Sequence, residues 1–192
     1  MKKIHFEEIT STQDYAKELI KQGDLDFMIT ASYQTKGRGK LHSKWYSDKG
    51  KNMLLTFSLP CPDIEKLYTY AIISCVGVRR VLNSYGIKGD IKAPNDIYVH
   101  GKKICGILCE AEFFDTKPYI IVGIGINVYS TDFPEGLNGT SMTTELGPIN
   151  VDIEKLAENV TCEVRKVYDE NFETVQKEYN LFLKEINKEK IE

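Results

Sequence analysis

The chain has 192 residues, of which 42% are hydrophobic and 28% are charged. This length and composition are those of one globular domain, and they exclude long disorder, collagen-like repeats and solenoids. The formal net charge of −3 argues against a dedicated nucleic-acid binder, because such domains are usually basic. No apolar run in the sequence is long enough for a membrane span.

The first half of the chain predicts strands and helices around one glycine-rich loop. In chain order these are a strand over 2–7, a helix from Ser11 to about Gln22, a strand over 27–33, a loop over 34–50, a strand over 53–59 and a helix over 64–85. Ser11 and Asp14 match a capping box at the start of the first helix. Apolar residues recur every three or four positions in the second helix, and Gly86 suits its C′ position.

The second half predicts a run of strands followed by helices. In chain order these are strands over 90–92, 96–99, 103–114 and 119–128, a loop over 129–150 and two helices from Val151 onward. His100-Gly101 predicts a tight hairpin turn. A phase change between two apolar stripes, the second ending at Ile186, predicts a break near Glu170 with Asn171 capping the last helix.

These elements predict an α+β (mixed α/β) fold with one mixed β-sheet and flanking helices. We expect a single domain over residues 1–187 and a polar tail over 188–192. The five cysteines form no Cys-x-x-Cys pair, which argues against a zinc site or a disulfide framework. Scattered thiols, and an N-terminus without a signal-peptide core, favour a cytoplasmic location. Cys105 and Cys109 share one strand face and are expected in the core.

A cationic loop is the first segment that suggests chemistry. Residues 34–40 read Gln-Thr-Lys-Gly-Arg-Gly-Lys, with Lys44 and Trp45 following closely. Glycines let a backbone approach a ligand, and the fork of Arg38 suits a phosphate or a carboxylate. Taken alone, the loop fits a flexible solvated segment equally well. Trp45 fits either the wall of an apolar pocket or ordinary packing.

Three further segments carry polar or glycine residues at informative places. Lys92 precedes a Pro-Asn turn and suits charge neutralisation at a phosphoryl group, although the segment alone reads better as a plain turn. Glycines in the apolar run 123–128 predict a bulge or the close approach of another group. Asn127 in that run needs a partner, which a ligand can supply. The helix start at Ser11 suits both capping and ligand binding.

In order and spacing, these segments resemble the catalytic domain of biotin protein ligases, over about residues 4–185. The matching segments are the Ser-Thr helix start at 11–12, Gly-Arg-Gly at 37–39 with Trp45 beyond it, Lys-x-Pro-Asn-Asp at 92–96, Gly-Lys-Lys-Ile-x-Gly-Ile-Leu-x-Glu at 101–110, Gly-x-Gly-Ile-Asn at 123–127 and Gly-Thr-Ser-Met at 139–142.

The resemblance implies two half-reactions. Biotin and ATP, with Mg²⁺, give biotinyl-5′-AMP and pyrophosphate, and a lysine of a biotin carboxyl carrier protein then takes the biotinyl group. That carrier belongs to acetyl-CoA carboxylase or a related carboxylase. Catalysis is then positioning and charge neutralisation, without a covalent enzyme intermediate. No residue is assigned to the metal. We expect no DNA or membrane partner, and exposed strand edges allow a homodimer.

The resemblance also implies roles for individual residues. The biotin-binding residues would be Ser11, Thr12, Gln13, Gln34, Gly37, Arg38, Gly39, Trp45 and Lys92. The nucleotide-binding residues would be Lys40, Lys103 and Asn127, and the catalytic ones Arg38, Lys40 and Lys92. Lys92 would stand at the reacting carboxylate and α-phosphate, so Lys92→Ala is expected to impair adenylation most.

Departures from the family pattern qualify this picture. Gln13 stands where the family usually has Asn, Ala93 replaces a common Trp, and Lys40-Leu41-His42-Ser43 replaces an arginine-rich stretch. We therefore expect looser retention of the adenylate, because Lys lacks the fork of Arg. We expect neither the family's N-terminal DNA-binding domain nor its C-terminal β-barrel, and hence no operon-repressor role. The alternatives are a lipoate or octanoate ligase or transferase of the same fold, and a non-catalytic biotin-binding module.

Overall fold

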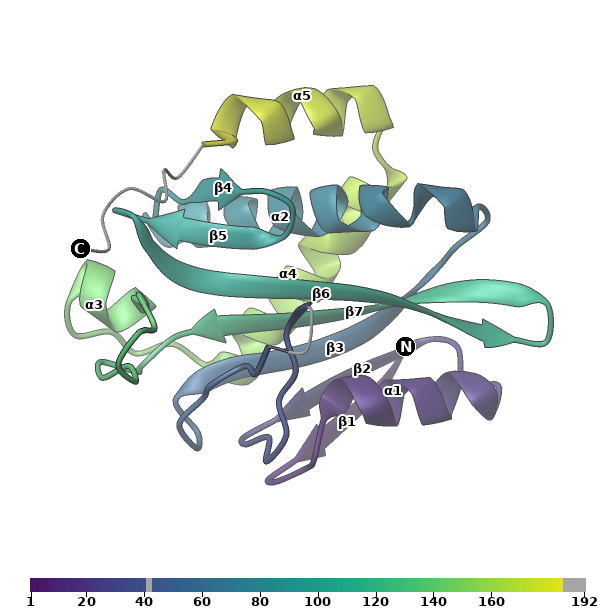
Figure 1. The fold of residues 1–192 in the computed structure, drawn as a ribbon, viewed down its shortest axis with the longest axis horizontal. Helices are drawn as coiled ribbons and strands as arrows, with labels where there is room; N and C mark the ends of the chain where they lie inside the picture. The colour runs from purple at the N-terminus through teal and green to yellow at the C-terminus, as the bar shows by residue number, and fades with distance from the viewer. Residues whose placement is uncertain (41–42, 185–192) are drawn as a thin grey trace.

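The computed structural model describes residues 1–40 and 43–184, which form a seven-stranded sheet with helices on both faces (Figure 1). The strand order is β1-β2-β3-β7-β6-β5-β4. β1 and β2 pair in parallel, and the other neighbours pair antiparallel. The predicted mixed α/β fold with one mixed sheet is confirmed. The expected tail over 188–192, Ile186 and the replaced residues Leu41 and His42 lie outside the described residues.

Each predicted strand is present within two residues of its expected ends. The strands are β1 (Lys2–Phe6), β2 (Phe27–Ala31), β3 (Asn52–Pro60), β4 (Asp90–Lys92), β5 (Asp96–Val99), β6 (Lys102–Phe114) and β7 (Lys117–Asn127). The tight turn between β5 and β6 is confirmed, since His100 and Gly101 both have positive φ, at 49° and 77°. This backbone conformation suits a two-residue hairpin connection.

The helices are α1 (Thr12–Lys21), α2 (Leu67–Ser84), α3 (Met142–Leu146), α4 (Ile153–Asp169) and α5 (Phe172–Phe182), with a 3₁₀ turn η2 (Ile64–Lys66) before α2. The predicted break near Glu170 is confirmed, and the Asn171 side chain accepts hydrogen bonds from two backbone N–H groups of α5. The prediction of a loop throughout 129–150 was wrong, because α3 lies within it. A five-residue helix is too short to show a repeat in its apolar residues.

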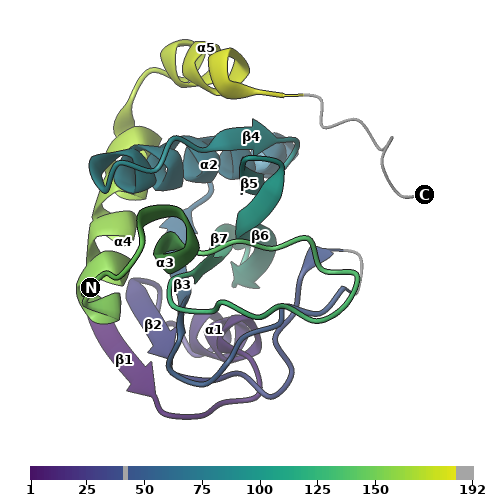
Figure 2. The same cartoon turned by 90° about the vertical axis from the view of Figure 1, so that its left-hand side faces the viewer.

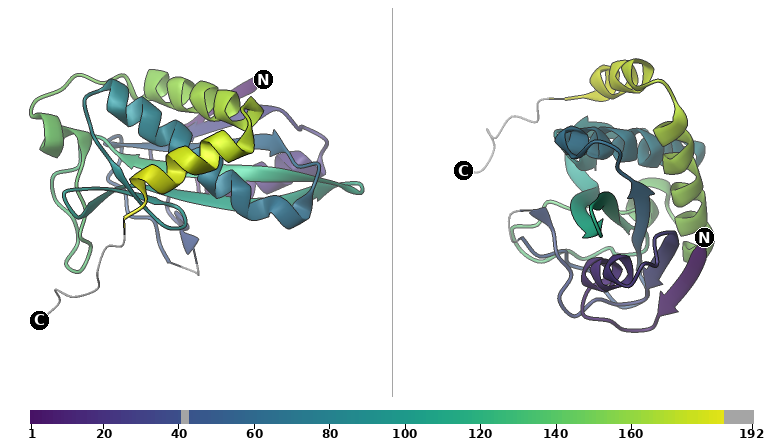
Figure 3. Two further views of the ribbon diagram at one scale, coloured as in Figure 1. Left: turned by 90° about the horizontal axis from the view of Figure 1, so that it is seen from above. Right: turned by 90° about the vertical axis from the view of Figure 1, so that its right-hand side faces the viewer.

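The two faces of the sheet carry different cores. Ile121 of β7 packs with Ala16 and Ile20 of α1 on one face. Its neighbours Ile120 and Val122 point to the other face, into the larger core under α2 and α4. Figure 2 shows α1 and α4 on opposite sides of β2 and β3, and Figure 3 shows α5 lying outside α2. The helix α1 therefore covers only one end of its face, which leaves room beside it over β6 and β7.

Cys105 is fully buried, and Cys109 packs against the same core, as expected from their shared strand face. Burial raises the pKa of the Cys109 thiol to about 12, so neither a thiolate nor nucleophilic chemistry is expected there. No helix in the described part of the chain has both the length and the apolar character needed to cross a membrane.

Candidate functional site

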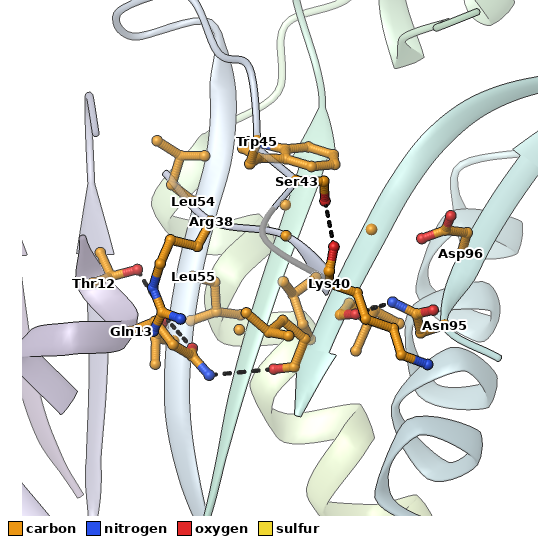
Figure 4. A pocket seen from close by; sticks show the side chains of 18 of the residues that line it. Thr12, Gln13, Arg38, Lys40, Ser43, Trp45, Leu54, Leu55, Asn95 and Asp96 are labelled. Carbon is orange, nitrogen blue, oxygen red and sulfur yellow. Dashed lines mark hydrogen bonds between the residues drawn. The ribbon is translucent and has the colours of Figure 1, made fainter. Parts of the chain in front are cut away.

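A cavity of about 310 Å³ lies beside α1 on its face of the sheet (Figure 4). Its walls come from the start of α1, from β3, β6 and β7, from the turn between β4 and β5, and from residues of the cationic loop. Thr12 and Gln13 lie on the α1 side, Asn95 and Asp96 lie on the β5 side, and Trp45 lies between them. Segments far apart in sequence thus meet in one place.

Glycines of β6 and β7 form the floor of this cavity. Gly106 and Gly125 are paired neighbours, and the Trp45 ring lies against both. A Cβ atom at Gly125 would stand 2.3 Å from Cε2 of Trp45, and one at Gly106 would stand 2.8 Å from Cζ3. The register of β7 with β3 and β6 is unbroken. Of the two outcomes predicted for strand glycines, the structure shows close approach and not a bulge.

Polar side chains gather at the α1 end of the cavity. Gln34 Oε1 accepts hydrogen bonds from the Thr12 backbone N–H at 2.8 Å and from Thr12 Oγ1 at 3.0 Å. Gln13 lies over Gly123, where a Cβ would stand 2.5 Å from its Oε1. Gln13 Nε2 donates to the Ile121 carbonyl at 3.2 Å. This network holds two amide side chains in fixed orientations at the cavity wall.

The capping box predicted at Ser11 is only half formed. Ser11 Oγ accepts from the Asp14 backbone N–H at 3.3 Å, as expected of an N-cap. The Asp14 carboxylate does not return to the helix start but pairs with Arg38 at 2.7 Å. The local rule failed here because a long-range ion pair competes for the same carboxylate.

Cations line the rest of the cavity. They are Arg38, Lys40, Lys44 and Lys103. The Lys103 ammonium lies 2.8 Å from Asp96 Oδ1 and 5.6 Å from the centre of the Trp45 ring. Arg38 makes a two-pronged contact with Glu110, whose oxygens lie 3.0 Å and 3.3 Å from the guanidinium nitrogens. Such a wall suits an anionic ligand.

Two buried donors at this cavity have no hydrogen-bond partner among the described residues. They are Nε1 of Trp45 and Nε of Arg38. Leaving a buried donor unpaired costs about 1–3 kcal/mol, so most native structures avoid it. Two such donors on residues that line one cavity fit a ligand that brings oxygen acceptors.

Lys92 is not among the residues that line the cavity. It ends the edge strand β4, and its ammonium lies 3.5 Å from the hydroxyl of Tyr98. Lys103, on the inner strand β6 and beside the glycine floor, is the lysine that lines it. Lys92 thus lies outside the residues that line this cavity, and its expected position at the reacting group stays a prediction.

Asn127 and Gly37 also lie apart from the cavity lining. Asn127 Nδ2 donates to the Thr140 carbonyl at 3.0 Å and to the Lys103 carbonyl at 3.3 Å. Its partners are thus backbone groups, and it holds the strand that carries Lys103. Gly37 lines an adjacent cavity of about 790 Å³, which shares Arg38 and Trp45 with the first. The expected nucleotide contact of Asn127 and biotin contact of Gly37 are not shown by this geometry.

The remaining sequence candidates all line the cavity. These are Ser11, Thr12, Gln13, Gln34, Arg38, Gly39, Lys40, Trp45 and Lys103. Sequence reasoning missed the parts of Thr56, Asp96 and Glu110. Thr56 bonds Thr12 at 2.8 Å from within an apolar strand, and its polarity there was the available signal. Asp96 and Glu110 end the segments 92–96 and 101–110, but sequence reasoning assigned neither residue a role.

Comparisons with known proteins agree on one family. The family model described as "Biotin/lipoate A/B protein ligase family" matches residues 5–127. The "Bifunctional ligase/repressor BirA" of Bacillus spizizenii is 36% identical over 153 residues, which are 75% of this chain and 47% of that protein. The chain thus spans about half the length of the curated relatives it matches.

Solved structures give the same picture. The biotin protein ligase of Aquifex aeolicus in complex with biotin and ATP has a TM-score of 0.79 and 26% identity, covering 95% of this chain and 78% of that one. The biotin protein ligase of Leishmania major in complex with biotin also has a TM-score of 0.79 and 26% identity, covering 98% and 84%.

Proposed function

The chain belongs to the biotin/lipoate A/B protein ligase family, and we propose that it is an ATP-dependent biotin–protein ligase. In the first step, a carboxylate oxygen of biotin attacks the α-phosphorus of ATP. The bond to the β-phosphate breaks, and biotinyl-5′-AMP and pyrophosphate form. In the second step, a lysine amine of a biotin carboxyl carrier protein attacks the acyl carbon, loses a proton and displaces AMP.

The observation that carries this proposal is the two-ended character of the cavity. One end holds Thr12, Gln13 and Gln34, whose hydroxyl and amide groups suit a ureido ring that both donates and accepts hydrogen bonds. The other end holds the cation Lys103, which suits a carboxylate or a phosphate, and Arg38, paired with Asp14 of α1, adds a positive charge on the α1 side (Figure 4). The missing side chains of the glycine floor let Trp45 and Gln13 lie close to the sheet between the two ends.

Lys103 is the residue we assign to the reacting centre. The ion pair with Asp96 at 2.8 Å holds its ammonium at the cavity wall. A cation there neutralises charge that grows on the α-phosphate as the carboxylate attacks. From the sequence we expected Lys92 in this role. The position of the Lys103 ammonium supports assigning the role to Lys103.

Arg38 and Lys40 would act beside it. Arg38 offers a fixed charge and an unpaired Nε donor, which suit an oxygen acceptor of the bound ligand. Lys40 lines the same cavity as a more mobile point charge. The Trp45 ring lies against Gly106 and Gly125, and its other face would contact the apolar part of the ligand.

Magnesium enters this proposal as part of the nucleotide substrate. Within residues 1–40 and 43–184, no group of three or more His, Cys, Asp or Glu side chains is arranged to hold a metal ion. The carboxylate of Asp96 is already paired with Lys103. We therefore assign no protein ligand to the metal and no step to a protein-bound metal.

The family also includes lipoate ligases, which is the strongest alternative. The polar α1 end of the cavity argues for biotin, because a ureido ring can exchange hydrogen bonds with hydroxyl and amide groups and the dithiolane ring of lipoate cannot.

Transfer of labelled biotin to a purified biotin carboxyl carrier domain tests the proposal. With ATP and Mg²⁺, we expect label on the acceptor lysine and no label when that lysine is replaced by arginine. An acceptor domain shown to be competent with another ligase but left unlabelled by this chain would contradict the proposal. Labelling by lipoate and not by biotin would establish the alternative.

A further inference from the structure

We propose that Glu110 is a positioning residue for the reaction, which orients the Arg38 guanidinium at the cavity and so sets the affinity for biotin. This inference rests on the proposed function. It concerns a glutamate of β6 to which neither the sequence motifs nor the cavity lining assigned a role. The inference is based on the contacts of Glu110 with Arg38, and Glu112 of the same strand provides a control.

The contacts fix both outer nitrogens of Arg38. Glu110 accepts from them at 3.3 Å and 3.0 Å, and Asp14 accepts a further bond at 2.7 Å. A two-pronged contact of this kind fixes the plane of the guanidinium as well as its position. Nε of the same group is buried and has no partner among the described residues. The carboxylates therefore use the outer nitrogens and leave Nε for a ligand.

Glu110 stays charged under ordinary conditions. Burial alone would raise the pKa of its carboxyl, but hydrogen bonds from Lys17 and Arg38 outweigh burial and hold that pKa below its usual range. The Lys17 ammonium lies 2.9 Å from the carboxylate, so it offsets part of the negative charge near the cavity. The carboxylate can thus orient Arg38 without cancelling its attraction for an anion.

The same strand supplies a matched control. Glu112 lies two residues along β6 and pairs with Lys21 of α1 at 3.6 Å, much as Glu110 pairs with Lys17. The structure shows no contact between Glu112 and Arg38 among the described residues. Glu112→Gln therefore removes a strand-to-helix ion pair, and Glu110→Gln removes such a pair together with the charge that orients Arg38.

Steady-state adenylation of biotin, measured by pyrophosphate release in the presence of hydroxylamine as acceptor, separates the two roles. We expect Glu110→Gln to raise the KM for biotin about ten-fold with a much smaller change in kcat, because it disturbs the orientation in which Arg38 makes a charge-assisted contact with bound biotin. Glu112→Gln should leave the KM unchanged. In an Arg38→Ala background, Glu110→Gln should add no further effect, since Glu110 acts through Arg38.

Three outcomes would overturn the inference while the proposed function stands. They are equal KM values for Glu110→Gln and Glu112→Gln, a lower KM in Glu110→Gln, and full additivity of Glu110→Gln with Arg38→Ala. Thermal unfolding of both glutamine variants checks that they fold. If wild-type protein releases no pyrophosphate in response to biotin, the proposed function itself has failed, which is a distinct result.

Discussion

The glycine floor gives the sharpest prediction about the cavity. In Gly125→Ala, the new Cβ would stand 2.3 Å from the Trp45 ring, whereas ordinary contact begins at 3.4 Å. The ring must therefore move by about 1.1 Å, a shift that weakens its contacts on the opposite side or forces neighbouring groups to move. Trp45 belongs to neither buried core cluster, so we expect the ring to yield at a cost to stability of about 1 kcal/mol, the lower end for overpacking.

The effect on ligand binding should be larger than the effect on stability. Trp45 walls the cavity, and its displacement removes the surface that would cover biotin, so we expect affinity to fall about ten-fold or more. Trp45 is the single tryptophan of the chain, so fluorescence excited at wavelengths that tyrosine does not absorb reports on this ring alone. Titration with biotin then gives affinity, and the emission maximum of the free protein gives ring displacement.

Gly123→Ala is the matched control for this experiment. Its Cβ would meet Gln13 Oε1 at 2.5 Å and not the indole. We therefore expect weaker biotin binding with an unchanged emission maximum in Gly123→Ala, and weaker binding with a shifted maximum in Gly125→Ala. Wild-type emission together with wild-type affinity in Gly125→Ala would refute the reasoning about the floor.

Three further predictions follow from the contacts. Lys103→Met should slow biotin-dependent pyrophosphate release about 100-fold or more, whereas Lys92→Met should keep most of the wild-type rate. A slow Lys92→Met and a nearly normal Lys103→Met would assign the role to Lys92. Arg80→Ala removes ion pairs to Glu170 at 2.5 Å and to Glu178 at 2.6 Å. It should lower the free energy of unfolding in urea by about 2 kcal/mol, and an unchanged midpoint would show that these pairs do not hold α5. The lowered pKa of Glu110 means that its ion pairs stabilise the fold above the ordinary value of 4.5 and lose that effect as the pH falls through the lowered one. The stability difference between wild type and Glu110→Gln should thus be full at neutral pH and shrink in acid, and a constant difference would exclude this linkage.

The fold could be predicted from the sequence where local rules act alone. The hairpin at His100-Gly101 and the cap at Asn171 depend on a few adjacent residues, and both were confirmed. The apolar run over 119–128 predicted a strand, and β7 is apolar on both sides because its neighbouring side chains serve two different cores. The helix α3 escaped detection since five residues show no period.

The site was less accessible to sequence reasoning, because its contacts join distant segments. Asp14 looked like a capping residue, and only the fold reveals that Arg38 takes its carboxylate. Two lysines eleven positions apart, Lys92 and Lys103, both suited a phosphoryl group by type. Strand order separates them in space, since one lies on the edge strand β4 and the other on β6 beside the glycine floor, and this placement is why we propose Lys103.

Release of pyrophosphate from ATP and Mg²⁺, with and without biotin and without any carrier protein, tests the central claim most directly. The account predicts a biotin-dependent burst that is close to one pyrophosphate per protein chain, followed by slow release as the adenylate escapes or hydrolyses. A folded wild-type chain that releases no more pyrophosphate with biotin than without it would contradict the assignment of this cavity to biotin adenylation.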